Sequence, residues 1–143
     1  MASVHELITL KPRVVHTISH DAPVLEAVAR MVSDDIGSLV VLRDGDPCGI
    51  FTERDFLTRV ALTDRVVKST LVREVMSPDV IFVRPDTDVG VCMALMTRLR
   101  MRHLPVLEDA ALVGLISIGD IIKHLARESE YETDELMHYI RGR

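Results

Sequence analysis

The stretch that decides the fold is GIFTERD, residues 49–55, which returns 65 positions later as GLISIGD, residues 114–120. Both stretches read glycine, two apolar residues, threonine or serine, two variable residues and aspartate. When the chain is compared with itself at this offset, residues 14–61 align with residues 79–126 without a gap, and 12 of the 48 pairs are identical. A gapless match of this length indicates that the chain contains two copies of one structural unit.

Each copy shows the same order of predicted elements around the motif. Asp21 is a good N-cap and Pro23 suits a first helical turn, so a helix is predicted there, with apolar residues at helical spacing behind it. The turn signal Asp44-Gly45-Asp46-Pro47 lies between two apolar runs and predicts a hairpin. The predicted elements are, in the first copy, strand 13–18, helix from 21, strands 38–42 and 48–52 and helix 53–62, and in the second copy strand 80–83, helix 89–99, strands 104–107 and 112–117 and helix 118–127.

The predicted unit is therefore β-α-β-β-α and about 60 residues long, which makes the chain an α+β protein built as a tandem repeat. A lone unit of roughly 60 residues buries only about 60% of its chain surface and is marginal in stability, so two copies are expected to share a core. We place the first repeat at 1–68, the second at 69–128 and a tail at 129–143. Short helices are predicted at 69–76 in the connecting segment and at 132–140 in the tail.

The composition argues against several classes of function. Of 143 residues, 48% are hydrophobic and 3% aromatic, with no Trp, which predicts an aliphatic core. The formal charge of −5 argues against a nucleic-acid or anionic-membrane surface as the main role. No apolar run approaches the roughly 18 residues of a membrane span, and the N-terminus lacks the features of a secretory signal. We therefore expect a cytoplasmic protein.

The sequence shows no pattern of a catalytic or metal site. Cys48 and Cys92 lie 44 positions apart without a CxxC pattern, which fits small core residues in a reducing compartment. The six histidines show no metal-ligand spacing with Cys, Asp or Glu. We expect a protein that is not an enzyme, has no catalytic cofactor and binds no metal.

Two interpretations of the repeated motif stay open. In the first, Thr52 with Asp55 and Ser117 with Asp120 are capping boxes that begin a helix and satisfy its free N–H groups. In the second, the hydroxyl contacts a phosphate or sugar oxygen, the carboxylate accepts hydrogen bonds from a vicinal diol, and the glycine leaves space beside the strand. A hydroxyl can cap a helix and still face a ligand, so the interpretations are compatible.

The order and duplication of these motifs resemble a known family. The segments TISHDAPVLEAV, IGSLVVLRDGDPCGIFTERDF, VREVMSPDVIFVRPDTDV, ALMTRLRMRHLPVLED and GLISIGDIIKHL are similar to a stand-alone bacterial protein with two CBS domains, the domain named after cystathionine β-synthase. The resemblance covers nearly the whole chain. It implies a Bateman module, in which two repeats are related by a pseudo-twofold axis and hold two clefts between them, with a short C-terminal helix.

The resemblance also implies a function. Such clefts commonly hold adenosine nucleotides, so AMP is the first expectation and ADP, ATP or NAD(H) the alternatives, each as a regulatory ligand. The protein would be a sensor in signal transduction, a homodimer that passes its ligand state to a separate protein partner. The competing hypothesis is a dimeric interaction module whose ligand sites are vestigial.

The family's contacts can be carried over to matching positions of this chain. The Ser/Thr and Asp of each motif would contact ribose and phosphate, and apolar residues with backbone groups would hold the base. Arg54, Arg102 and His103 would converge on phosphate, with a solvated surface for the arginines and a structural role for His103 as the alternatives. Lys11 and Arg13 are weaker phosphate candidates. The residues predicted to bind the ligand are Thr17, Ile18, Gly37, Ser38, Leu39, Thr52, Arg54 and Asp55 in the first repeat and Val83, Arg102, His103, Leu104, Pro105, Ser117 and Asp120 in the second.

Overall fold

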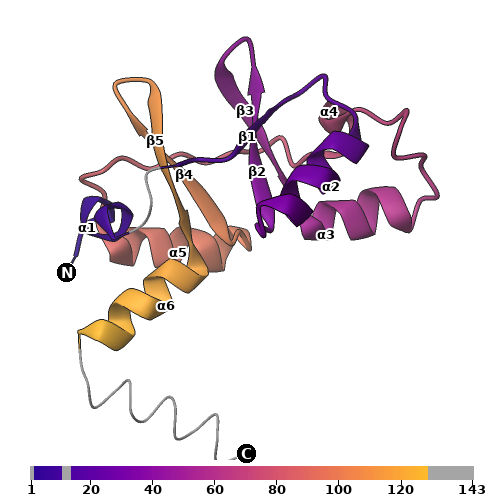
Figure 1. Ribbon diagram of the computed structural model, residues 1–143. Helices are drawn as coiled ribbons and strands as arrows, with labels where there is room; N and C mark the ends of the chain where they lie inside the picture. The colour runs from indigo at the N-terminus through magenta and orange to yellow at the C-terminus, as the bar shows by residue number, and fades with distance from the viewer. Residues whose placement is uncertain (1, 11–13, 129–143) are drawn as a thin grey trace, which may run out of the picture. The chain divides into compact units, whose positions relative to one another are not determined.

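A computed structural model describes residues 2–10 and 14–128, and these fall into two compact units. The first unit comprises residues 14–81, and the second comprises residues 2–10 together with 82–128. The predicted tail helix at 132–140 and the candidates Lys11 and Arg13 lie outside the described residues. The α-helices and strands of both units are labelled in Figure 1.

The first unit has a three-stranded sheet in the order β1-β2-β3. Strand β1 runs parallel to β2, which pairs antiparallel with β3. The helix between β1 and β2 makes a crossover, as a parallel pair requires. The elements of the first unit are β1 (Thr17–Ser19), α2 (Val24–Ser33), β2 (Ser38–Arg43), β3 (Asp46–Thr52), α3 (Glu53–Asp55), the π-helix η1 (Phe56–Ala61) that continues α3, and α4 (Val72–Val75).

The second unit repeats this plan with a two-stranded sheet. The predicted strand at 80–83 is wrong, because only Val83 pairs, through one parallel bridge to Val106. The predicted helix at 118–127 is confirmed. The elements of this unit are α1 (Val4–Thr9), α5 (Val89–Leu99), β4 (His103–Glu108), β5 (Ala111–Ser117) and α6 (Ile118–Arg127).

The two hairpins match in register as well as in sequence. Ser38 faces Thr52 in the first hairpin, and His103 faces Ser117 in the second. Both hairpins carry an irregularity at the same place, between Val41 and Leu42 in one and 65 residues later in the other. The internal repeat predicted from the sequence is therefore a repeat of backbone geometry.

Each unit has an aliphatic core of its own, so the prediction from the composition is confirmed but the expectation that the two copies share one core is wrong. The buried residues of the first core are largely Val, Leu, Ile and Ala, with Phe51 as the aromatic member. Leu104, Ile116 and Ile121 are fully buried in the second core. Fully burying a side chain of this kind stabilises a fold by about 1.5–3 kcal/mol, so these residues hold the sheet against its helices.

The start of α2 differs from its prediction by two residues. Pro23, not Asp21, is the N-cap, with an extended backbone at φ −69° and ψ 150°. The N–H of Val24 donates to the carbonyl of Thr70 at 2.8 Å, so the connecting segment satisfies it. Asp21 instead accepts a 2.5 Å hydrogen bond from the Arg73 guanidinium.

The second helix of each repeat also differs between the copies. In the first unit, residues 56–61 form a π-helix, with the N–H of Leu62 donating to the carbonyl of Leu57 at 3.1 Å. The hydroxyls of Thr58 and Thr63 each donate to a carbonyl four residues back, where they compete with the α-helical N–H bonds. Position 123, the equivalent of Thr58, is a lysine, and α6 stays α-helical.

Each sheet is covered by a segment that precedes or follows its own repeat in the sequence. In the second unit α1 packs on β5, with Val4 and Leu7 in the core, and in the first unit α4 packs on β3. The predicted repeat boundaries at 68 and 128 stay a prediction. The compact units divide the described residues differently, because residues 2–10 belong to the same unit as residues 82–128.

This arrangement explains the glycine that opens each motif. A Cβ on Gly114 would lie 2.9 Å from Cγ2 of Ile8, and a Cβ on Gly49 would lie 2.9 Å from the carbonyl oxygen of Ser77. The interpretation that these glycines leave room for a ligand is wrong, because residues of the chain itself occupy the space.

Replacing Gly114 with Ala should destabilise the second unit. The new methyl group would meet the Ile8 side chain of α1, and overpacking of this kind costs about 1–3 kcal/mol. Urea unfolding measures the loss. Gly119→Ala is the matched control, since its Cβ would come no nearer than 3.6 Å to another atom and Ala favours a helix by about 0.5–1 kcal/mol. Equal stability of the two variants would contradict the packing role.

Candidate functional site

The repeated motif places its hydroxyl and carboxylate at the junction of a strand and a helix. Thr52 ends β3 in an extended conformation, with φ −120° and ψ 166°, and its Oγ1 accepts the Asp55 N–H at 3.1 Å. Asp55 Oδ2 accepts in return from the Thr52 N–H at 3.0 Å and from the Thr52 hydroxyl at 3.1 Å. The two side chains form a capping box that begins the helix.

The second unit has the same junction. The Ser117 N–H donates to Asp120 Oδ2 at 2.8 Å, and the Asp120 N–H donates to Ser117 Oγ at 3.1 Å. Capping is thus confirmed in both repeats. It accounts for the spacing of the hydroxyl and the carboxylate and leaves open whether they also contact a ligand.

The two carboxylates differ in their surroundings. Asp55 is 6% exposed, and its Oδ1 accepts a 3.0 Å hydrogen bond from the Ser77 hydroxyl. The Arg59 Nε lies 3.9 Å from the same oxygen. Asp120 is only half-buried. The carboxylate of the first site is therefore the more deeply buried of the two, a difference the motif does not reveal.

Most of the other predicted residues of the first repeat lie close to this junction. Ser38 faces Thr52 across the hairpin, and the Glu53 N–H donates to the carbonyl of Gly37 at 3.0 Å. Ser38 and Leu39 are buried, and Arg54 is exposed. Thr17 and Ile18 lie on β1, opposite Val40 and Val41 of β2. Gly37, Ser38 and Leu39 therefore lie at the same end of the sheet as Thr52, whereas Thr17 and Ile18 lie further along β2, toward the hairpin turn.

The second repeat gathers its predicted residues in the same way. His103 faces Ser117, and the Ile118 N–H donates to the carbonyl of Arg102 at 3.0 Å. The Val83 N–H donates to the carbonyl of Pro105 at 3.0 Å. Leu104 and Pro105 are buried, His103 is half-buried and Arg102 is exposed.

The charges of the two arginines proposed to bind phosphate are not neutralised by a described acidic side chain. Arg54 and Arg102 are exposed, and neither forms an ion pair within residues 2–10 and 14–128. Arg54 belongs to the first unit, and Arg102 and His103 belong to the second. Their convergence on one phosphate group stays a prediction.

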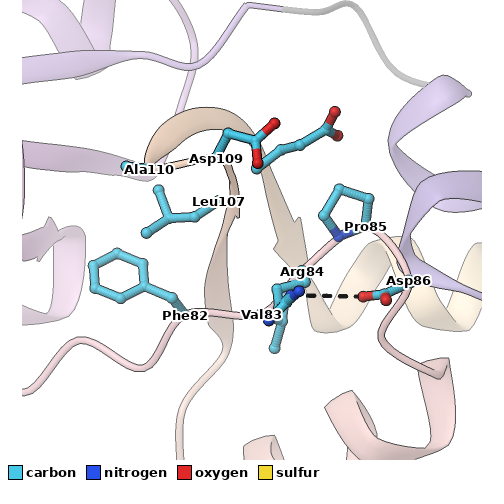
Figure 2. Close-up of a pocket in the computed structure, with 9 residues that line it drawn as sticks. Phe82, Val83, Arg84, Pro85, Asp86, Leu107, Asp109 and Ala110 are labelled. Atoms are coloured by element: carbon cyan, nitrogen blue, oxygen red, sulfur yellow. Dashed lines mark ion pairs between the residues drawn. The ribbon is translucent and has the colours of Figure 1, made fainter.

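Each unit also has a hollow, and of the residues predicted to bind the ligand only Thr17 and Ile18 line the first and only Val83 lines the second. One of about 380 Å³ lies at the hairpin turn of the first unit, and one of about 620 Å³, shown in Figure 2, lies at the equivalent turn of the second. Asp44 lines the first hollow and Asp109, its equivalent 65 residues later, lines the second. The identity of these two residues in the repeat could have indicated the hollows, but aspartate is also common in turns for conformational reasons. The hollows are lined by Thr17, Ile18, Ser19, Glu26, Arg30, Leu42, Asp44 and Gly45 in the first unit and by Phe82, Val83, Arg84, Pro85, Asp86, Leu107, Glu108, Asp109 and Ala110 in the second.

The two cysteines are poor nucleophiles. Burial raises the pKa of Cys48, although the charge of Arg43 acts in the opposite direction. Burial also raises the pKa of the Cys92 thiol, and the Asp88 carboxylate adds to the shift. A reactive thiol needs a lowered pKa, so their surroundings fit core residues.

Two further properties hold for the described part of the chain. Residues 2–10 and 14–128 contain no group of three or more His, Cys, Asp or Glu side chains placed to hold a metal ion. Over the same residues, no helix has the length and apolar character to cross a membrane.

Comparison with known proteins identifies the repeat. The CBS domain family model matches residues 5–62 and again residues 72–127. The chain belongs to the CBS domain family. The resemblance to stand-alone two-CBS proteins and the predicted tandem CBS fold are thereby confirmed. Tandem CBS domains are generally regulatory modules that bind adenosine-derived ligands.

Several CBS proteins are similar over most of the chain. A putative signal-transduction protein with CBS domains from Burkholderia ambifaria is 40% identical, with 90% of this chain and 96% of that one covered and a TM-score of 0.85. The mitochondrial CBS domain-containing protein CBSX3 of Arabidopsis thaliana is 39% identical over 127 residues, 85% of this chain and 62% of the relative. A hexameric CBS-CP12 protein from bloom-forming cyanobacteria is 31% identical, with 85% of this chain and 66% of that one covered and a TM-score of 0.76.

Removing the cap of the first CBS repeat should lower its stability. Thr52→Ala removes the acceptor of the Asp55 N–H, and the loss of an N-cap costs about 0.5–2 kcal/mol. Thr52→Ser keeps the hydroxyl and should stay near the parent protein. The free energy of unfolding in urea measures both variants. If Ala and Ser behaved alike, the hydroxyl would not be what stabilises this junction.

Proposed function

We propose that this CBS protein is an adenosine-nucleotide sensor, with AMP as the first candidate ligand and ADP, ATP or NAD(H) as alternatives. It would act without chemistry of its own, as a cytoplasmic homodimer that reports its ligand state to a separate protein. The observation that carries the proposal is the duplicated hydroxyl and carboxylate, which both units place at the same strand-to-helix junction.

The neighbourhood of each junction supports this function. A ribonucleotide needs a carboxylate for its vicinal diol, polar groups for phosphate and an apolar wall for its base. Thr52 and Asp55 lie beside the start of β2, where Ser38 faces Thr52. Ser117 and Asp120 lie beside Arg102 and His103. Each repeat therefore gathers candidates for these contacts within a few residues of its motif.

A second candidate function rests on the exposed apolar residues of the helices. Leu57 in the first unit and Ile122 in the second occupy equivalent positions, and they are 58% and 54% exposed. Exposed apolar residues in equivalent places suit an interface between subunits, and the cyanobacterial relative is hexameric. In this alternative the protein is a dimeric interaction module with vestigial ligand sites.

Titration with AMP tests the carboxylates directly. Asp55→Ala and Asp120→Ala should each weaken binding at their own site by roughly 10- to 150-fold, because a hydrogen bond to a charged acceptor contributes about 1.5–3 kcal/mol. Isothermal calorimetry gives the affinities. Asp46→Ala removes an exposed carboxylate that lines neither a motif junction nor a hollow and should leave the affinity unchanged. Unchanged affinity in both motif variants would refute the assignment.

A thermal-shift panel separates the sensor from the interaction module. With AMP, ADP, ATP or NAD(H) at a hundred times its dissociation constant, a sensor gains roughly 2.7 kcal/mol of stability. An interaction module gains nothing from any of them. In the latter case Leu57→Lys should change the oligomeric state in light scattering, whereas Thr58→Lys, a neighbouring exposed position, should not.

A further inference from the structure

The segment that connects the two CBS repeats is held by contacts to the first motif and to the helix that follows it. Ser77 pairs with Ile50 of β3, with N–H to carbonyl distances of 2.8 and 3.0 Å in the two directions. The Ser77 hydroxyl donates to Asp55 Oδ1 at 3.0 Å. The Arg59 guanidinium donates to the carbonyl of Met76 at 2.7 Å. The backbone of residues 76–77 is therefore attached both to the edge of the sheet and to the start of the helix.

The equivalent positions of the other repeat lack these side chains. Sixty-five residues before Ser77 stands Pro12, which has no hydroxyl. The equivalent of Arg59 is His124, whose Nε2 lies 3.1 Å from a carboxylate oxygen of Glu128 on its own helix. The hydroxyl and the guanidinium are thus not repeated at the positions 65 residues away in the sequence.

The acceptor capacity of Asp55 links this contact to ligand binding. A carboxylate has about four acceptor positions, two on each oxygen. Asp55 Oδ2 already accepts two hydrogen bonds from Thr52, and Oδ1 accepts one from Ser77 with Arg59 close by. A vicinal diol brings two hydroxyl donors to the carboxylate. Both can be accepted at Oδ1 only when the Ser77 hydroxyl leaves it.

We propose that Ser77 is a latch, which competes with the sugar of the nucleotide for Asp55 and holds the connecting segment to β3 in the free protein. This inference rests on the proposed function for its ligand and on the contacts of Asp55 for its mechanism. Sugar binding at the first site breaks the Ser77–Asp55 hydrogen bond, which loosens the pairing of Ser77 with Ile50. Occupancy of the first site then changes the freedom of the segment that joins the repeats.

Hydrogen exchange of the free, full-length protein tests the latch before any ligand is added. Ser77→Ala should speed exchange of the amide of residue 77 by about tenfold, because the bond to a charged acceptor that supports this backbone pairing is lost. Ser77→Thr keeps the hydroxyl and should restore slow exchange. Ser69→Ala, an exposed serine of the same connecting segment, should have no effect at residue 77. Equal exchange in the parent and in Ser77→Ala would overturn the proposal.

Addition of AMP tests the competition. In the parent protein, AMP should speed exchange at residue 77, and Ser77→Ala should bind AMP about tenfold more tightly at the first site because no hydroxyl has to be displaced. Ser77→Thr should bind as the parent does. AMP binding that Asp55→Ala weakens but Ser77→Ala does not strengthen would overturn the latch and leave the sensor function standing.

The two failures are distinguishable. If calorimetry shows no binding of AMP, ADP, ATP or NAD(H) to the parent, the sensor function fails and the ligand-dependent half of the latch is overturned with it. The exchange data of the free protein still decide whether Ser77 holds the connecting segment.

Discussion

The structure depends on a constraint of size, namely that a repeat of about 60 residues is only marginally stable when it buries its own apolar surface alone. The second sheet has only two strands, and its core is completed by Val4 and Leu7 of α1. The first core is completed by Val72 and Val75 of α4. Each covering segment lies outside the β-α-β-β-α block that it covers, so neither block folds as the sequence repeat alone defines it.

The same constraint decides the use of the motif glycines. Glycine at the start of GIFTERD and GLISIGD allows a covering segment to approach the strand closely, within 2.9 Å of where a Cβ would lie. In the first repeat that segment continues to Ser77, whose hydroxyl reaches Asp55. Packing has therefore brought the connecting segment into contact with the carboxylate of the first motif, which is proposed to bind the sugar.

Much of the fold could be predicted from sequence because it depends on local signals that the repeat presents twice. The hairpins, the helix at 118–127 and the capping boxes at Thr52 and Ser117 follow from turn residues, apolar spacing and a hydroxyl three residues before a carboxylate. The failures have non-local causes. Asp21 does not cap α2 but forms a hydrogen bond with Arg73, 52 residues away. Residues 80–83 lack the sheet pairing that would make them a strand, apart from the single bridge of Val83. The π-helix at 56–61 reflects competition from two threonine hydroxyls.

The sequence by itself determined the family, the duplication and the residue types at each candidate site, because these depend on the order of residues along the chain. The tertiary structure alone decided which segment covers which sheet, and hence what surrounds each carboxylate. Asp55 and Asp120 occupy equivalent places in the sequence, yet Asp55 is 6% exposed and bonded to Ser77, 22 residues away. Burial and hydrogen bonding of this kind arise from contacts between segments that are distant in the sequence, so they cannot be predicted from a local motif.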